Sequence, residues 1–530
     1  MIAGCQSEKA PPADDGVQQP ADSGAVDGGL DGVGDGSGEG DGGGDGGAEE
    51  TLSVGPVQAC AAPRSAVAYE AHSADLGFMR RDTDADQHLA GSSLIVDDLD
   101  EDGDLDIVQG MEGSALRVYW AEGEGYRPED LTPTPIWGRL RPFDGDGDGR
   151  SDVVALSPPA IWARAEGGLA PGADFMGFGE RFRGMDAQPL DLNGDGAMDF
   201  FVPGSAPGDD PEARRDFLIF GSEASEVRVE PLPGLEATGN AAQASAIDWD
   251  GDGDLDVMVT NDMGFMFGGN RLWINEGGAL RSAAAEGCLP TFSGMAHAFG
   301  DYDRDGIEDL FLAATFEGRL LRREADGTCI DYSRATGADP LLSRSRSLNP
   351  MIWSSAFLDF DNDGLLDLIH AEGDLYHGED GLPRYEAPID LMQQQADGTF
   401  VDVSAALGLS REGSHRAVVA DDLNGDGVLD LVVADVEEPL RLYLSTGCTA
   451  DAWLRVEAPE QTTVEVEAGG GRWVAVARAE VSVSGFRRPL VHVGLGAVET
   501  IDRVTLRPLV GEPVVIEGPL EPRRALRWTP

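Results

Sequence analysis

Seven short stretches of the sequence place acidic side chains at alternating positions, and this spacing suits the binding of a hard cation. The first reads DLDEDGDLD from Asp98, and the second reads DGDGDGRSD from Asp144. Carboxylates a few ångströms apart repel one another by roughly 1 to 4 kcal/mol per pair, depending on the local dielectric. These stretches therefore need a counter-charge. Calcium accepts six to eight oxygens in flexible geometry, so it fits them better than magnesium does.

Each stretch follows the pattern D-x-[DN]-x-D-G-x-x-D. Positions 1, 3, 5 and 9 would supply side-chain oxygens, position 7 a backbone carbonyl, and the glycine at position 6 permits a sharp turn. The sequence thus predicts up to seven Ca²⁺ ions. The predicted ligands are Asp98, Asp100, Asp102, Asp104, Asp106, Asp144, Asp146, Asp148, Arg150, Asp152, Asp191, Asn193, Asp195, Ala197, Asp199, Asp248, Asp250, Asp252, Asp254, Asp256, Asp301, Asp303, Asp305, Ile307, Asp309, Asp359, Asp361, Asp363, Leu365, Asp367, Asp422, Asn424, Asp426, Val428 and Asp430.

The twelfth position separates these stretches from EF-hand and dockerin loops, which place an acidic ligand there on an emerging helix. In this sequence the twelfth position holds Gln109, Ala155, Val202, Val259, Leu312, His370 and Val433. Strand-like segments such as DVMVTND and DLFLAAT contain this position. We therefore expect a shorter calcium loop that closes at position 9 and is flanked by strands. The alternative is a set of acidic surface turns that bind nothing.

The spacing of the stretches predicts the fold. They recur every 46 to 63 residues, which leaves room for four short strands in each repeat. A period near 50 residues is typical of propeller blades or large solenoid units. The sequence therefore predicts an all-β protein with a seven-bladed β-propeller over residues 59–450, and an open β-solenoid is the alternative. Alternating apolar and polar residues after residue 450 predict a small β-sandwich domain over residues 451–530.

Charge and composition limit the partners. The 530 residues carry a formal net charge of −59, which argues against nucleic acid and anionic membrane surfaces. Residues 6–58 are rich in Gly and Asp, so we expect a disordered linker, with a glycine-rich nonapeptide calcium array as the alternative. Residues 1–5, MIAGC, resemble the end of a bacterial lipoprotein signal in which Cys5 is lipidated. The basic and apolar regions of such a signal are missing, which indicates either a truncated start or a coincidence.

The repeats resemble the FG-GAP/VCBS family, whose blades build the seven-bladed propeller of integrin alpha subunits. GTFVDVSAALGLS (398–410) and NRLWINEGG (270–278) resemble segments of its bacterial and cartilage acidic protein branch. In that branch an ASPIC/UnbV domain follows the propeller, and DAWLRVEAP and PLVHVGLGAVETIDRVTLR resemble the two ends of that domain. Its glycine-rich middle is shortened here to EAGGGRWVAV, so a binding role of that part does not carry over. The resemblance implies an exported, calcium-bearing interaction scaffold with no established common reaction.

The remaining cysteines, Cys60, Cys288, Cys329 and Cys448, permit three pairings in an oxidising compartment. Cys60 opens the repeat region and Cys448 ends it, so a bridge between them would lock a closed ring. Cys288 and Cys329 would then join neighbouring blades. Four buried free thiols are the alternative.

The sequence contains no His-Glu-x-x-His, Gly-x-Ser-x-Gly or Cys-x-x-Cys motif, and we predict no catalytic residue. For His370 and His377 we favour packing or surface roles over zinc binding or general-base catalysis. Five tryptophans would either form a carbohydrate platform or pack the blades: Trp120, Trp162, Trp249, Trp273 and Trp353.

Three functions are consistent with this pattern. We favour a monomeric, calcium-stabilised scaffold that is secreted or held at the cell surface as an outer-membrane lipoprotein and that binds protein or glycan. An extracellular polysaccharide lyase or hydrolase is the alternative, and a purely structural envelope protein is the third.

Overall fold

The computed structural model describes most of the repeat region and nearly all of the C-terminal region. The described residues are 51–58, 60, 67–72, 92–111, 115–123, 125–131, 137–144, 150–157, 159–165, 168–171, 186–205, 214–221, 228–232, 239–343, 351–373, 386–436, 438–446 and 450–529. Cys5, His377, Cys448 and nearly all of the predicted linker lie outside them.

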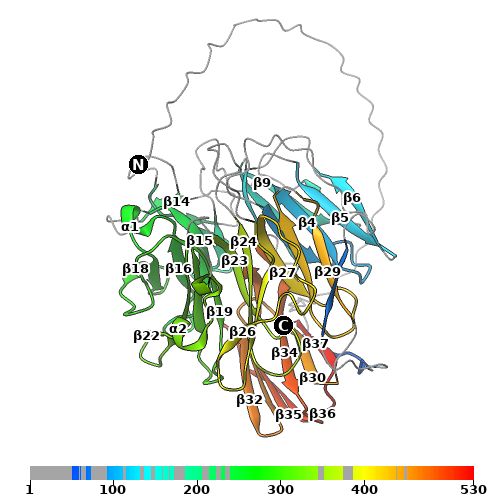
Figure 1. The fold of residues 1–530 in the computed structure, drawn as a ribbon. Helices are drawn as coiled ribbons and strands as arrows, with labels where there is room; N and C mark the ends of the chain where they lie inside the picture. Colours follow the sequence, from blue (N-terminus) through cyan, green and yellow to red (C-terminus); the bar gives the residue numbers. More distant parts are fainter. Residues whose placement is uncertain are drawn as a thin grey trace, which may run out of the picture. The chain divides into compact units, whose positions relative to one another are not determined.

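Each repeat forms one set of four antiparallel strands, and the colours of Figure 1 follow these sets along the chain. The first three sets are β3(Ser92–Asp97), β4(Asp106–Met111), β5(Arg117–Glu122) and β6(Gly125–Asp130); β7(Trp137–Phe143), β8(Asp152–Ser157), β9(Pro159–Ala165) and β10(Gly168–Pro171); and β11(Gln188–Leu190), β12(Asp199–Val202), β13(Phe217–Phe220) and β14(Arg228–Pro231).

The next three sets continue in the same order. They are β15(Ala241–Ile247), β16(Asp256–Asn261), β17(Arg271–Asn275) and β18(Leu280–Ala283); β19(Gly294–Gly300), β20(Asp309–Ala314), β21(Gly318–Arg323) and β22(Cys329–Asp331); and β23(Met351–Leu358), β24(Asp367–Gly373), β25(Asp390–Gln394) and β26(Phe400–Asp402). Among the described residues, short helical turns lie between strands at α1(Gly264–Phe267), α2(Ser333–Thr336) and η5(Pro340–Ser343).

The last repeat is completed by a strand from the start of the chain. Its own strands are β27(His415–Asp421), β28(Asp430–Asp435) and β29(Arg441–Ser445), and β2(Tyr69–His72) pairs with β29 as the fourth. The first strands of successive repeats contact one another in order from β3 to β27, and β27 contacts β3. The prediction of an all-β fold built from four-stranded sheets is therefore confirmed. The closed order of contacts is the one expected for a propeller.

Burial decreases from the first strand of a repeat to the last. Every residue of β15 and β16 is buried, whereas every residue of β14 is exposed. Inner strands pack against neighbouring sheets through both faces, which explains their nearly continuous apolar sequences. The outer strands carry charges such as Arg228 and Glu230, which protect a sheet edge from pairing with another chain.

The C-terminal residues form two further sheets that enclose a core of their own. One sheet is β32(Gly471–Val476), β31(Thr463–Ala468), β35(Ile501–Arg507) and β36(Val514–Leu520). The other contains β30(Ala452–Glu457), β37(Arg524–Thr529), β34(Gly485–Gly496) and β33(Arg478–Ser482). Leu454, Val464, Val504 and Leu526 are fully buried between them. We call residues 450–529 the C-terminal domain.

The prediction of a disordered linker over residues 6–58 is wrong at the C-terminal end of this segment. Residues Thr51–Val54 form strand β1, which pairs with β37 from Thr51↔Thr529 to Val54↔Leu526. The segment TLSV supplies the β-branched and apolar residues that a strand needs, although the stretch before it does not.

The hairpin of β33 and β34 enters the repeat region. Strand β34 pairs in parallel with β3, with Leu94 opposite Gly485, and the hairpin also contacts β7, β19, β23 and β27. At the tip, Ser482 Oγ donates a hydrogen bond to the carbonyl of Val418 over 2.8 Å. Glu480 accepts hydrogen bonds from Gln243 and Ser245 of β15. The hairpin therefore contacts the innermost strands of six repeats.

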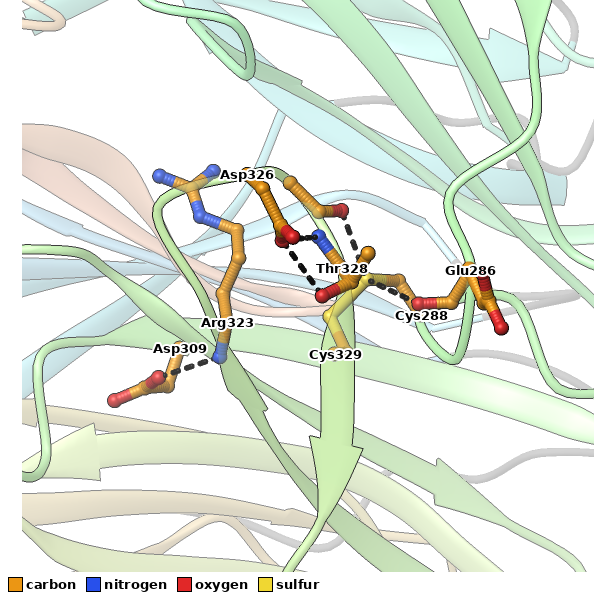
Figure 2. The surroundings of a disulfide bond; sticks show 8 residues. Glu286, Cys288, Asp309, Arg323, Asp326, Thr328 and Cys329 are labelled. Carbon is orange, nitrogen blue, oxygen red and sulfur yellow. Dashed lines mark hydrogen bonds between the residues drawn. A yellow bond between two sulfur atoms is a disulfide. The ribbon is translucent and has the colours of Figure 1, made fainter.

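One disulfide joins two adjacent sheets (Figure 2). Cys288 follows β18, Cys329 begins β22, and their sulfurs are 2.04 Å apart. This agrees with the prediction that the two residues join neighbouring blades. Cys60 is also disulfide-bonded, and its pairing with Cys448 stays a prediction because Cys448 lies outside the described residues.

Candidate metal-binding loops

The seven Asp stretches are the loops that connect the first strand of each repeat to the second. In the six that are described throughout, the carboxylate at position 1 accepts a hydrogen bond from the N–H of the glycine at position 6. The pairs are Asp98–Gly103, Asp191–Gly196, Asp248–Gly253, Asp301–Gly306, Asp359–Gly364 and Asp422–Gly427, at 2.9 to 3.2 Å. These bonds curl each loop around its own acidic side chains.

The glycine at position 6 is required by backbone conformation. Its φ lies between 84° and 98° in the six loops, a region that L side chains rarely adopt. Position 4 is also left-handed, and there three loops use Glu101, Arg304 and Asn362, with φ of 60° to 63°. The D-x-[DN]-x-D-G-x-x-D pattern does not specify this second turn position, although glycine occupies position 4 in the other four stretches.

The carboxylate at position 9 has a structural role besides the predicted one of metal ligand. One oxygen accepts the N–H at the end of the third strand, at 2.6 to 2.9 Å in all seven loops. The pairs are Asp106–Ala121, Asp152–Arg164, Asp199–Gly221, Asp256–Asn275, Asp309–Arg323, Asp367–Gln394 and Asp430–Ser445. The Asp309–Arg323 bond is drawn in Figure 2.

The other oxygen of position 9 accepts the N–H of position 2 in the six loops described throughout, as Asp309 does from Tyr302 at 3.2 Å. This single carboxylate therefore holds together the loop, the second strand that it begins and the third strand. Residue spacing showed where this aspartate lies, but its partner at the end of the third strand comes from another part of the repeat.

The loops converge enough carboxylate oxygens to hold a metal ion. In four of them, ligand atoms of positions 1, 3 and 9 all lie within 4.8 Å of one another: Asp98, Asp100 and Asp106; Asp248, Asp250 and Asp256; Asp301, Asp303 and Asp309; and Asp359, Asp361 and Asp367. Buried oxygens of Asp98, Asp100 and Asp359 have no hydrogen-bond partner. An all-oxygen, anionic donor set with unsatisfied atoms fits a hard cation.

The remaining predicted ligands divide into three groups. Asn193 and Asn424 stand at position 3, and each accepts the N–H of position 5, at 3.0 and 2.9 Å. At position 7, the N–H groups donate to the position-5 carboxylate, and the residues are Asp104, Ala197, Asp254, Ile307, Leu365 and Val428. In the second loop, Asp144, Arg150 and Asp152 are described, while Asp146 and Asp148 lie outside the described residues.

The electrostatics of the loops favour a bound cation. Burial, together with neighbouring carboxylates, raises the pKa of Asp309 and of Asp430 to about 8. The same causes raise the pKa of Asp106 and of Asp301 to about 7. A carboxyl group with such a pKa takes up a proton near neutral pH unless a positive charge replaces that proton. A metal ion would supply this charge.

The histidine and tryptophan candidates serve packing. His370 is buried, shares a hydrogen bond with Ser355 Oγ at 2.9 Å and packs on Phe311 with ring centroids 4.7 Å apart. The five tryptophans are at most 9% exposed, so the platform interpretation is wrong for them. Their buried rings fill the space between sheets. The described residues contain no helix with the length and apolar character of a membrane span.

Some of these loops lie in repeats that resemble a known family. The FG-GAP-like repeat family matches residues 98–155 and 236–312, which include four of the seven loops. Human cartilage acidic protein 1 is 27% identical over 249 residues, which cover 42% of this chain and 34% of that protein. The mouse protein is 23% identical over 79% of this chain and 70% of its own length. This chain thus spans about a third of the human relative. None of these names states a reaction.

Two solved structures show weak overall similarity. One, titled as recognition of non-reducing terminal N-acetylglucosamine by an Agrocybe aegerita lectin, is 13% identical, with a TM-score of 0.37 over 70% of this chain and 88% of that chain. The other, YCF48 bound to D1 peptide, is 10% identical, with a TM-score of 0.39 over 70% and 98%. The sequence matches carry the comparison: this chain contains FG-GAP-like repeats and is similar to cartilage acidic protein 1.

Proposed function

We propose that this protein is an exported, calcium-stabilised β-propeller that serves as a cell-surface interaction scaffold for a protein or glycan. The observation that carries the proposal is the convergence of carboxylates at positions 1, 3 and 9 in repeated loops. Each loop is bonded to the second and third strands of its own repeat, so an ion in the loop would stabilise the sheet as well as the turn.

The expected size of this stabilisation is substantial. A site with a Kd of about 0.1 mM contributes about 1.4 kcal/mol at millimolar calcium. Several such sites together would match the whole stability of a typical domain, which is about 5 to 15 kcal/mol. Since calcium reaches millimolar levels outside cells, extracellular loops of this affinity would be occupied there.

Export is supported by the disulfide between Cys288 and Cys329, because disulfides persist in oxidising compartments. A propeller over residues 59–450 and an ASPIC/UnbV-like domain over residues 451–530 complete the proposed architecture. A lipid on Cys5 would hold it at the outer membrane, and we expect a monomer whose partner is an extracellular protein or a glycan.

Thermal melting of the full chain in calcium, magnesium and EGTA tests the metal part of the proposal. We expect calcium to raise Tm by at least 10 °C over EGTA, and magnesium to raise it less. Asp248→Asn, which removes a loop charge, should reduce the calcium shift, whereas the exposed control Glu499→Gln should keep it. Equal melting temperatures in calcium and EGTA would contradict the proposal.

A glycan array and a surface-protein binding screen, each with and without calcium, test the scaffold part. Calcium-dependent binding to a defined glycan or protein supports it. Turnover of a polysaccharide by the purified chain would instead favour the enzyme alternative.

A further inference from the structure

The loops differ in what covers them. A Cβ atom placed on Gly103, Gly196 or Gly253 at position 6 would meet nothing within 4 Å. At the same position in the later loops, a Cβ on Gly306 would lie 2.6 Å from a guanidinium nitrogen of Arg472, and one on Gly364 would lie 3.2 Å from Trp473 Nε1. These covering side chains belong to β32 of the C-terminal domain.

The loop of residues 422–430 is covered in the same way. A Cβ on Gly427 would collide with the indole ring of Trp453, a residue of β30. The glycine at position 6 is accordingly buried at Gly364 and Gly427 and exposed at Gly103 and Gly196. The C-terminal domain therefore lies on the loops of residues 301–309, 359–367 and 422–430, which we call the covered loops. The loops of residues 98–106, 191–199 and 248–256 are the open loops.

Asn362 connects two covered loops to the C-terminal domain. Its backbone carbonyl accepts the N–H of Gly496 at 2.9 Å, and its side-chain oxygen bonds His492 Nε2 at 2.7 Å. Its side-chain nitrogen donates to the carbonyl of Gly427 at 2.8 Å. Two residues further along the same loop, the carbonyl of Gly364 accepts the indole N–H of Trp473 at 3.1 Å. The left-handed turn at position 4 presents Asn362 to these partners.

The ligand side of this loop is closed off as well. Asp359 at position 1 is 2% exposed, whereas Asp98, Asp191 and Asp248 at the same position are half-buried. Gly494 of β34 lies so close to the Asp359 carboxylate that any side chain there would clash. Water therefore reaches the metal-binding oxygens of the open loops more readily than those of residues 359–367.

We propose that the C-terminal domain retains the ion held by the covered loops, and above all by residues 359–367, so that this ion leaves only when the domain moves away from the repeats. The proposal rests on the proposed function, because it takes calcium as the ion of the loops. An ion in an open loop exchanges directly with solvent. The chain therefore holds two kinetic classes of calcium, and the slow class couples the C-terminal domain to the repeat region.

Calcium release from the full chain tests this. The protein is loaded with ⁴⁵Ca, freed of unbound ion and mixed with excess EGTA, and the retained label is counted over time. We expect a fast phase from the open loops and a slow phase of at least one ion per chain. Release in a single phase would overturn the proposal, while the absence of any bound calcium before EGTA is added would contradict the proposed function itself.

Paired variants assign the phases. Asp359→Asn should abolish part of the slow phase, and Asp98→Asn should reduce only the fast phase. Trp473→Ala should speed the slow phase at least tenfold and leave the fast phase unchanged. The control Val510→Ala, at a side chain 86% exposed, should change neither. A slow phase that Trp473→Ala leaves unchanged would overturn the proposal.

A milder change guards against misfolding. Trp473→Phe keeps an aromatic ring but removes the indole N–H that the carbonyl of Gly364 accepts and part of the ring area, so it should speed slow release by a smaller factor than Trp473→Ala. Hydrogen exchange of the loaded protein gives a second measurement. The amides of residues 359–367 should exchange faster in Trp473→Phe than in the parent, while those of residues 98–106 keep their rate. Equal protection of residues 359–367 in the two proteins would count against the proposal.

Discussion

Arg141 forms a two-pronged ion pair with Asp186 in the interior of the repeat region. Its Nε and one terminal nitrogen donate to the two carboxylate oxygens over 2.8 and 2.7 Å, and neither residue is more than 2% exposed. Burial alone would raise the pKa of Asp186, but the charges of Arg141 and Arg139 outweigh this effect and hold the pKa below its ordinary value. Glu480 of the C-terminal hairpin lies 3.3 Å from the same guanidinium.

Replacing Asp186 with Ala should therefore be strongly destabilising. Two buried arginines, Arg139 and Arg141, would lose their main counter-charge, and breaking such a pair costs about 3 to 5 kcal/mol. Urea unfolding measures the change in free energy. The control is Glu517→Ala, which breaks an exposed pair with Arg503 and should cost less than about 1 kcal/mol. Similar costs for the two variants would show that the buried pair contributes little.

The position-9 carboxylates should matter even without metal. Asp309→Ala in EGTA would leave the N–H groups of Tyr302 and Arg323 without their acceptor, and each unsatisfied buried donor costs about 1 to 3 kcal/mol. Asp305→Ala, at an exposed position of the same loop, should cost much less in EGTA. Denaturant unfolding of both variants checks this. If Asp305→Ala were the more damaging change under these conditions, the structural role of position 9 would be wrong.

The metal-free protein should become less stable as the solution is made alkaline. The pKa of Asp309 and of Asp430 is about 8 in the folded chain, against about 3.9 in an unfolded one. Between these two pKa values the folded state binds more protons than the unfolded state. The stability of the folded state therefore falls as pH rises toward 8. In EGTA we expect Tm to be higher at pH 7.0 than at pH 8.5.

Saturating calcium should remove or reverse this difference, because the ion binds the deprotonated carboxylates. The buried His297 does not confound the comparison. Burial lowers the pKa of His297 to about 3, so His297 is neutral in the folded state, and above pH 7 it is mostly neutral in the unfolded state too. A Tm in EGTA that stays constant or rises between pH 7.0 and pH 8.5 would contradict the assignment.

Reduction of the Cys288–Cys329 bridge should destabilise the chain. The two residues are 41 positions apart, and closing a loop of this length stabilises a protein by about 4 kcal/mol in the chain-entropy model. Cys288→Ser should lower the urea midpoint under non-reducing conditions. Adding reductant should then lower the midpoint of the parent by more than that of the variant. If reductant shifts both proteins equally, another bridge is responsible.

Local residue patterns predicted where the loops lie, because the geometry of each loop depends on residues that are close together in the sequence. The Asp98–Gly103 bond and the left-handed glycine lie within one nine-residue stretch, and Asp106 begins the predicted strand. The third-strand partners of position 9 were out of reach, since Arg323 lies on another strand, 14 residues beyond the aspartate to which it donates. Alternating residues after 450 predicted strands in the C-terminal region, but nothing in them indicated that β34 would pair with β3.

The same limit explains the misplaced boundary at the start of the chain. TLSV at residues 51–54 is too short and too isolated for its periodicity to indicate a strand. It becomes one only because β37 offers an open edge. Likewise, Asn362 reads as an ordinary loop residue until His492 and Gly496 are placed beside it.

The pairing of Tyr69 with Ser445 has a consequence for biosynthesis. The last sheet obtains its outer strand from β2, which is synthesised early in the chain. Strand β2 must therefore remain unpaired until residue 445 has emerged from the ribosome. During that interval the edges of β2 remain open to foreign strands. A nascent chain of this design cannot mature repeat by repeat, so we expect it to depend on holding chaperones until synthesis ends, and ring closure to set the pace of its folding.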